Sequence, residues 1–262
     1  MDVNIEIVTL SKSGGREYNE DVYGHWSNGR FVACLVADGA GGHGGGDVAA
    51  STARSSILGG YALSPSLDGA FLKQLLEQAN LDVVARQAEG GKLAAMRTTA
   101  VLAVLDTQEQ ALVWAYSGDS RAYLFRGGAI VARTLDHSLV QQMVAGGMLD
   151  EEGARLHPQR NMLLSALGSI SDPLEIDVSG RMRLQIGDVL LLCSDGVWEV
   201  LGDRLLLETL DAASNARGWA DLLDRQVQNR AKPNHDNYTA LISWVSEDDD
   251  QTTRLLSASA TT

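Results

Sequence analysis

Three apolar segments that each lead into an aspartate constrain this chain most. The segments and their aspartates are FVACLVA with Asp38, ALVWAYSG with Asp119, and VLLLCS with Asp195. Nearly unbroken apolar runs of this length, rich in β-branched and aromatic residues, are typical of strands buried on both faces. Three buried strands that each deliver an aspartate predict one shared acidic site.

A glycine-rich turn follows the first of these strands. Six of the eight residues in 39–46 are glycine. Glycine allows the backbone to turn tightly and to approach a ligand closely. We therefore expect the backbone after Asp38 to lie close to a bound group and an Ala-rich helix to begin near Asp47.

Composition narrows the classes of function. The chain has 262 residues and a net charge of -13, and no basic patch is visible, which argues against a nucleic-acid partner. Cys34 and Cys193 lie inside apolar runs, where we expect them to be small core side chains. We expect no disulfide between them, which suits a protein of a reducing compartment. No apolar run approaches the roughly 20 residues needed to cross a bilayer. We expect a cytoplasmic protein with no membrane partner.

The order of helical and strand-like segments predicts an α+β domain. Paired helices and hairpin-like strands favour a four-layer α/β/β/α sandwich, in which two mostly antiparallel sheets are flanked by helices. One turn, at 186–188, is expected to join strands at 181–184 and 189–193. We assign residues 1–247 to a single domain, and residues 248–262, which lack a core pattern, to a disordered acidic and Ser/Thr-rich tail.

The acidic residues next to the predicted strands form a candidate metal-binding set. Its members are Glu20, Asp21, Asp38, Asp119, Asp195 and Asp236. Clustered carboxylates repel one another unless a cation neutralises them. Oxygen ligands of this kind suit Mg²⁺ or Mn²⁺, and they do not distinguish the two. Two such ions about 3.5–4 Å apart could activate a water for in-line attack on a phosphate.

Eight motifs, in order, resemble those of the bacterial metal-dependent type 2C protein serine/threonine phosphatases, the PPM family. They are RxxNED from Arg16, VADGxGGH from Val36, Thr98-Thr99, GDSR from Gly118, DHS from Asp136, ALG from Ala166, SDG from Ser194 and Asp236-Asn237. The resemblance runs from about Gly14 to Trp244.

The resemblance implies roles for the acidic set. Asp38 resembles the residue that bridges both metals, with the Gly39 carbonyl on one of them. Asp195 and Asp236 resemble ligands of the first metal. A carboxylate of Glu20 or Asp21 is expected at the second metal, directly or through water, and the resemblance leaves open which one.

Two further roles come from the same resemblance. Asp119, with Asp195, resembles the site of a third, more weakly held metal in bacterial members. Arg16 resembles the phosphate-binding arginine, and a guanidinium can hold two phosphate oxygens at once.

The insertion at 141–168 resembles the flap that covers the site and contacts the protein substrate. Its candidate substrate-contacting residues are Gly146, Gly147, Arg160 and Asn161. Its glycines and polar composition fit a segment that moves as a gate.

This chain departs from the family pattern at the position that is expected to donate a proton to the leaving group. Eukaryotic relatives place a histidine directly after the Asp-Gly pair, where this chain has Ala40. His43 or a metal-bound water could serve as the general acid.

We therefore expect a phosphoprotein phosphatase that acts on phosphorylated proteins and opposes a bacterial Ser/Thr kinase. One alternative is a catalytically silent phosphoprotein-binding regulator with the same fold. Another is an enzyme dedicated to regulating one cellular machine.

Overall fold

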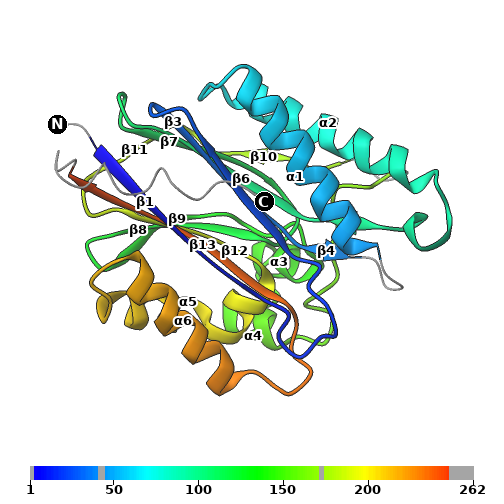
Figure 1. The fold of residues 1–262 in the computed structure, drawn as a ribbon. Helices are drawn as coiled ribbons and strands as arrows, with labels where there is room; N and C mark the ends of the chain where they lie inside the picture. Colours follow the sequence, from blue (N-terminus) through cyan, green and yellow to red (C-terminus); the bar gives the residue numbers. More distant parts are fainter. Residues whose placement is uncertain (1–2, 41–44, 171–173, 248–262) are drawn as a thin grey trace.

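The computed structural model describes residues 3–40, 45–170 and 174–247. Two stacked sheets form its centre, and a pair of helices covers the outer face of each sheet (Figure 1). Every strand pair recorded for these residues is antiparallel. The predicted α+β sandwich is confirmed. The predicted tail at 248–262 and His43 lie outside the described residues.

The first sheet joins the two ends of the chain. Its order is β1 (Val3–Lys12), β13 (Tyr238–Glu247), β12 (Val189–Cys193), β8 (Arg121–Arg126) and β9 (Ala129–Arg133). β1 and β13 pair over ten residues each, from Val3 opposite Glu247 to Lys12 opposite Tyr238. This pairing places the segment before β13 beside the segment after β1.

The second sheet contains two of the three apolar runs. Its order is β10 (Asp177–Val178), β7 (Ala111–Ser117), β6 (Ala100–Asp106), β3 (Phe31–Ala37) and β2 (Val22–Ser27), with β11 (Met182–Arg183) also paired to β7. A separate short pair consists of β4 (Gly39–Ala40) and β5 (Arg97–Thr98).

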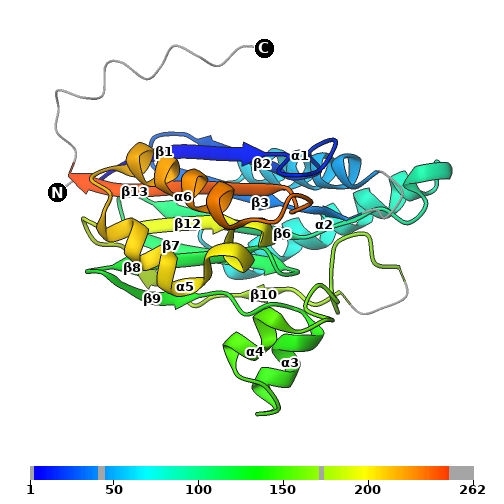
Figure 2. The ribbon, with the colours of Figure 1, turned by 90° about the horizontal axis from the view of Figure 1, so that it is seen from below.

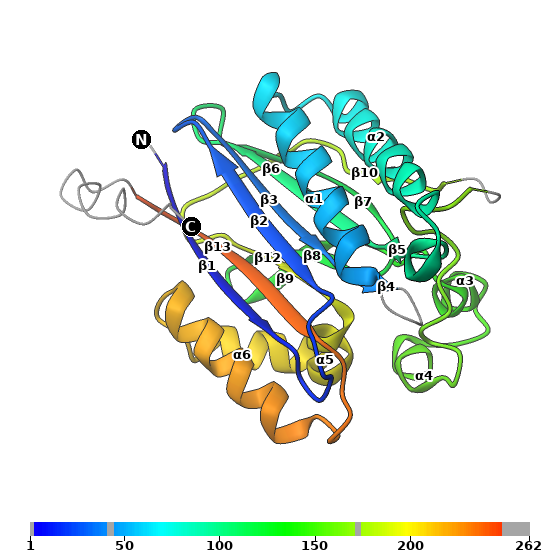
Figure 3. The ribbon, with the colours of Figure 1, turned by 45° about the vertical axis from the view of Figure 1, so that its right-hand side comes forward.

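Helices form the outer layers because each presents an apolar stripe to a sheet. α1 (Gly46–Leu63) and α2 (Gly69–Gln87) cover the second sheet, whereas α5 (Asp195–Asp211) and α6 (Ala216–Arg230) cover the first (Figure 3). A third apolar core fills the space between the sheets. A 3₁₀ turn, η1 (Gly91–Leu93), follows α2. None of the helices described is long and apolar enough to cross a membrane.

Two short helices leave the layers altogether. α3 (Leu139–Ala145) and α4 (Glu151–Leu156) project together from the body of the molecule (Figure 2). They correspond to the predicted flap at 141–168. The excursion closes at a bridge between Ser138 and Leu163, and Leu167 already pairs with Thr98 of β5. The last residues of the predicted flap therefore lie against the sandwich.

Two sequence expectations differ from the structure. No strand was expected at β2, because its sequence VYGHWS carries no apolar run; in the structure its residues alternate between half-buried and exposed. The strands at 181–184 and 189–193 do not form a hairpin, because β11 pairs with β7 in the second sheet and β12 belongs to the first. The turn at 186–188 therefore crosses between the two sheets.

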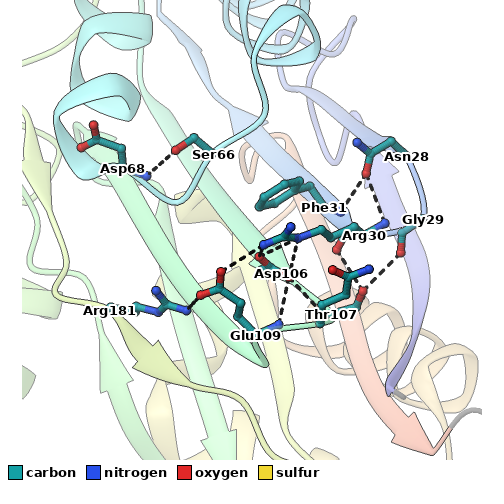
Figure 4. A network of polar contacts seen from close by, with 11 residues as sticks. Asn28, Gly29, Arg30, Phe31, Ser66, Asp68, Asp106, Thr107, Glu109 and Arg181 are labelled. Carbon is teal, nitrogen blue, oxygen red and sulfur yellow. Dashed lines mark hydrogen bonds and ion pairs between the residues drawn. The ribbon is translucent and has the colours of Figure 1, made fainter. Parts of the chain in front are cut away.

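Buried aspartates at one edge of the sandwich are fully paired. Asp106, at the end of β6, accepts hydrogen bonds from Arg30 Nε and Nη2 and from the backbone N–H groups of residues 108 and 109 (Figure 4). Asp188, just before β12, accepts from Arg126 Nε and Nη2 at 2.7 and 2.8 Å. We call this the paired edge.

Candidate metal centre

The predicted aspartates meet at the opposite edge, which we call the acidic edge. Asp38 ends β3, Asp119 lies between β7 and β8, and Asp195 begins α5 directly after β12. Burial raises the pKa of Asp38 well above its usual range, and the charges of Asp21, Asp195, Asp119 and Asp236 raise it further. The five carboxylates are thus close enough to repel one another.

Three of the neighbouring carboxyl groups also have raised pKa values, because they are buried close to other carboxylates. Burial, together with the Asp236 charge, raises the pKa of Asp21 to about 6. Burial and then the charge of Asp136 raise the pKa of Asp119 to about 7, against the lowering effect of Arg121. Burial and then the charge of Asp119 raise the pKa of Asp195 well above its usual range. A bound cation would lower these pKa values again, because it stabilises the ionised carboxylates.

The donor set fits hard divalent cations. Asp21 Oδ1 and Asp195 Oδ1 are buried and have no hydrogen-bond partner among the described residues. Unsatisfied buried carboxylate oxygens are costly unless they have a partner, and a metal ion can be that partner. Over the ranges described, no three His, Cys, Asp or Glu side chains are grouped so that they could hold a metal ion by themselves, so water and backbone oxygens would have to complete the coordination. An open arrangement suits Mg²⁺ or Mn²⁺, which keep several water ligands.

Glu20 and Asp21 point to different neighbours. Glu20 Oε1 accepts a hydrogen bond from the Gly46 N–H at 3.2 Å. A Cβ added to Gly46 would lie 2.8 Å from both Glu20 Oε1 and the Gly39 carbonyl oxygen, so these two oxygens are neighbours. Asp21 is buried instead, where it accepts from Ser194 Oγ at 2.7 Å and lies within hydrogen-bonding reach of Asp38.

The glycines around Asp38 are required by backbone packing. A Cβ on Gly39 would lie 2.2 Å from the Gly46 carbonyl oxygen. No side chain fits in that space. The backbones of Gly39 and Gly46 therefore pack directly against each other between β4 and the start of α1, and the approach of this turn to a bound group stays a prediction.

Two threonines hold the backbone of Asp38. The Thr99 N–H and Thr98 Oγ1 both donate to the Asp38 carbonyl at 2.9 Å. The Asp38 N–H donates to Thr99 Oγ1 at 3.0 Å, and that hydroxyl lies 2.6 Å from Ser120 Oγ. This chain of bonds links the loop of Asp38 to the loop of Asp119, a role that the Thr98-Thr99 motif alone did not reveal.

Asn237 is a positioning residue that sequence reasoning treated only as the neighbour of Asp236. Its side-chain Nδ2 donates to the carbonyls of Ser13 and Tyr18, and its Oδ1 accepts from the Glu20 N–H at 2.8 Å. A buried amide that joins three loop groups fixes the 13–20 loop beside β13. An Asn directly after a candidate ligand was the only signal in the sequence.

Arg16 lies on the open side of the acidic edge. Its Nη2 donates to Asp236 Oδ2 at 2.8 Å, and both side chains are about half exposed. Its guanidinium therefore stands beside a candidate ligand and remains accessible to an incoming phosphate.

The flap is tied to α5. Gly146 ends α3, and Gly147 adopts a positive φ of 70° in the turn that follows. Arg160 Nε lies 3.1–3.2 Å from the carboxylate oxygens of Glu199, and Arg155 Nη1 donates to the Glu199 carbonyl at 2.9 Å. The next residue, Asn161, is exposed.

Comparisons with known proteins agree with this architecture. The family model described as Stage II sporulation protein E (SpoIIE) matches residues 28–245. The serine/threonine phosphatase stp of Listeria innocua is 32% identical over 233 residues, which cover 87% of this chain and 90% of the relative. Protein phosphatase PhpP of Streptococcus pneumoniae is 30% identical over 253 residues, covering 94% and 99%.

Solved structures show the same fold. The serine/threonine phosphatase Stp1 of Staphylococcus aureus superimposes with a TM-score of 0.84 at 26% identity, covering 93% of this chain and 96% of that one. The catalytic domain of the phosphatase PstP, solved in complex with two manganese ions, gives a TM-score of 0.79 at 26% identity, covering 94% and 100%.

These similarities extend over nearly the whole described sandwich, and they confirm both the resemblance and the prediction of a phosphoprotein phosphatase. The chain belongs to the SpoIIE/PPM-type family of bacterial serine/threonine phosphatases.

Proposed function

We propose that the protein hydrolyses phosphoserine and phosphothreonine in protein substrates with a water activated by two divalent cations, Mn²⁺ or Mg²⁺. The observation that carries this proposal is the group of buried aspartates without cationic partners at the acidic edge. When bound, two such cations neutralise these charges, polarise the phosphate and lower the pKa of a water held for in-line attack.

The neighbours of each carboxylate support a division of roles. Asp38 is central to the cluster, so we assign it to both cations. The Glu20 carboxylate and the Gly39 carbonyl lie together and are assigned to one cation. Asp195 and Asp236 are assigned to the other. Of the pair left open by the sequence, Glu20 is favoured as the direct ligand because it shares its position with the Gly39 carbonyl.

The remaining groups position the substrate. Arg16 would release Asp236 and hold two phosphate oxygens in its fork. Asp119, next to Asp195, is the candidate for a third, weaker cation site. His43 remains the candidate proton donor for the leaving oxygen. The flap, with Gly146, Gly147, Arg160 and Asn161, would cover the phosphorylated segment.

In the cell we propose that this activity opposes a Ser/Thr kinase. The relatives that support this role are called serine/threonine phosphatases or protein phosphatases. The alternative of a silent phosphoprotein-binding regulator has no specific support, because each predicted acidic ligand is present.

The test measures turnover of p-nitrophenyl phosphate and a phosphothreonine peptide with Mn²⁺, with Mg²⁺ and with EDTA. We expect metal-dependent turnover, and calorimetric titration should show at least two Mn²⁺ ions per chain. Asp38→Ala is the control, which should lose turnover and bind fewer ions. If Mn²⁺ gives the wild-type protein no turnover above Asp38→Ala, the proposal is wrong and the silent regulator is favoured.

A further inference from the structure

A cavity of about 590 Å³ lies between the flap and α5, beside the acidic edge. We call it the flap pocket. Part of its lining is apolar and includes Val140 of α3, Ala154 of α4 and Leu201 of α5, which we call the apolar floor. The side chains that line it come from α3 and α4 of the flap on one side and mainly from α5 of the sandwich on the other. A cavity of this size could hold a few residues of a peptide.

The flap pocket shares a wall with the candidate metal centre. Trp198 lines the pocket, and its Nε1 donates to the Asp119 carbonyl at 2.9 Å. The Arg121 guanidinium stacks 3.5 Å from the centre of the Trp198 ring and forms two 2.8 Å bonds to Asp136. These fixed side chains keep the wall rigid, so a chain lying in the pocket would pass directly beside the carboxylates.

The positive charges around the pocket are all arginines. Six arginines and four carboxylates line it, in a protein whose net charge is -13. Four of the six arginines are paired with carboxylates, as in the Arg121–Asp136 pair. The other two differ. Arg204 is 84% exposed and forms a longer, 3.5 Å ion pair with Glu208 one helical turn away, and the partner recorded for Arg230 among the described residues is the neutral side chain of Gln226.

We propose that the flap pocket binds an acidic segment of the phosphoprotein substrate, within a few residues of the phosphorylated side chain. The carboxylates of that segment would pair with Arg204 and Arg230, because a guanidinium fork matches carboxylate geometry. The apolar floor accommodates the aliphatic part of the segment. This inference rests on the proposed function and adds a preference among substrates.

The test compares two phosphothreonine peptides that differ only in their flanking residues, Asp and Glu in one and Asn and Gln in the other. The wild-type protein should hydrolyse the acidic peptide with a kcat/KM roughly fivefold to tenfold higher, as two partly exposed ion pairs allow. The preference should shrink as ionic strength rises. Turnover of p-nitrophenyl phosphate, which is too small to reach the pocket, normalises each value.

The double variant Arg204→Glu/Arg230→Glu should lose or reverse the preference. The matched control is Arg217→Glu/Arg225→Glu, which makes the same charge change at exposed positions of α6 that do not line the flap pocket. An equal kcat/KM for both peptides in the wild type, or an equal loss of preference in the control, would overturn the proposal.

A binding measurement separates this proposal from the proposed function. The same acidic peptide, unphosphorylated and carrying a fluorophore, is titrated with protein and followed by anisotropy. If turnover is absent but the acidic peptide binds more tightly than the neutral one, and Arg204→Glu/Arg230→Glu removes the difference, the pocket stands and the hydrolytic role fails. If turnover is normal but both peptides bind equally, only the pocket proposal fails.

Discussion

Aspartates are buried at both edges of the sandwich, but their neighbours are arginines at one edge and other carboxylates at the opposite edge. At the paired edge, Asp188 is fully buried and forms two bonds to Arg126. At the acidic edge, Asp195 Oδ1 is buried without a hydrogen-bond partner among the residues described. The pKa values diverge accordingly. Desolvation opposes the shift at Asp106, but bonds from Arg30 lower its pKa, whereas burial and neighbouring carboxylates raise the pKa of Asp38.

This difference teaches that burial of an aspartate does not identify a functional site. An aspartate paired with arginine stabilises the fold, while a group of buried aspartates without cations is subject to repulsion that a bound cation or protonation relieves. This repulsion is therefore the physical signature of the proposed metal centre.

The largest expected effect comes from Asp38→Asn. The substitution removes the proposed shared ligand, so kcat with Mn²⁺ should fall by on the order of 10³-fold, equivalent to several kcal/mol of transition-state stabilisation. Urea denaturation of the metal-free protein should show unchanged or higher stability, because a neutral amide relieves repulsion. A loss of metal-free stability in this variant would break the contrast between the edges.

The paired edge should respond in the opposite way to Asp188→Asn. This change leaves Arg126 without its full carboxylate partner and should lower the free energy of unfolding by about 2–3 kcal/mol. Turnover measured well below the unfolding transition should stay close to that of the wild type, because Asp188 lies at the far end of β12 from Asp195. Reduced turnover with unchanged stability would contradict the assignment of this edge to the fold.

The last prediction concerns the pH dependence of stability. The pKa values of Asp21 and Asp119 are raised to about 6 and about 7 in the folded protein, against about 4 in an unfolded chain. Between about pH 4 and 7 these two groups hold more protons in the folded state, so their contribution to stability falls as pH rises.

Urea midpoints of the EDTA-treated protein should therefore be higher at pH 5 than at pH 7.5, and Mn²⁺ should reduce this difference. The lowered pKa of Asp106 acts with the opposite sign: its stabilising contribution is present above about pH 4 and is lost below it. A urea midpoint of the EDTA-treated protein that is higher at pH 7.5 than at pH 5 would contradict the argument that the carboxylates of the acidic edge repel one another.

Much of the scaffold was predictable because its signals are local. β3 was predicted at residues 31–37 and occupies Phe31–Ala37. In α2, Leu72, Leu75 and Leu76 recur at helical spacing in the sequence and are buried in the core. The strand-end aspartates were also predicted to meet, because three buried strands that each lead into an aspartate indicated one shared acidic site.

Other features depend on contacts between distant residues. Asn237 joins loops more than 200 positions away, and Ser194 bonds to Asp21 across 173 positions. The flap pocket needs the flap, α5 and α6 in one place. Hydrophobic periodicity and turn residues do not predict these long-range contacts, because they form only when the two sheets pack together.

The sequence by itself determined that apolar strands would end in aspartates and that the chain is a phosphatase of the PPM type. It placed Asp38 in the acidic set, but it did not show that Asp106, which also follows an apolar run, is paired with an arginine. In the antiparallel register of β3 and β6, Phe31 lies opposite Asp106, so Asp106 and Asp38 lie at opposite edges of the sandwich. Asp106 therefore pairs with Arg30 at one edge, whereas Asp38 lies among other carboxylates at the other edge. The tertiary structure decided which aspartates stabilise the fold and which are left to bind a cation, because that outcome depends on the neighbours that strand pairing supplies.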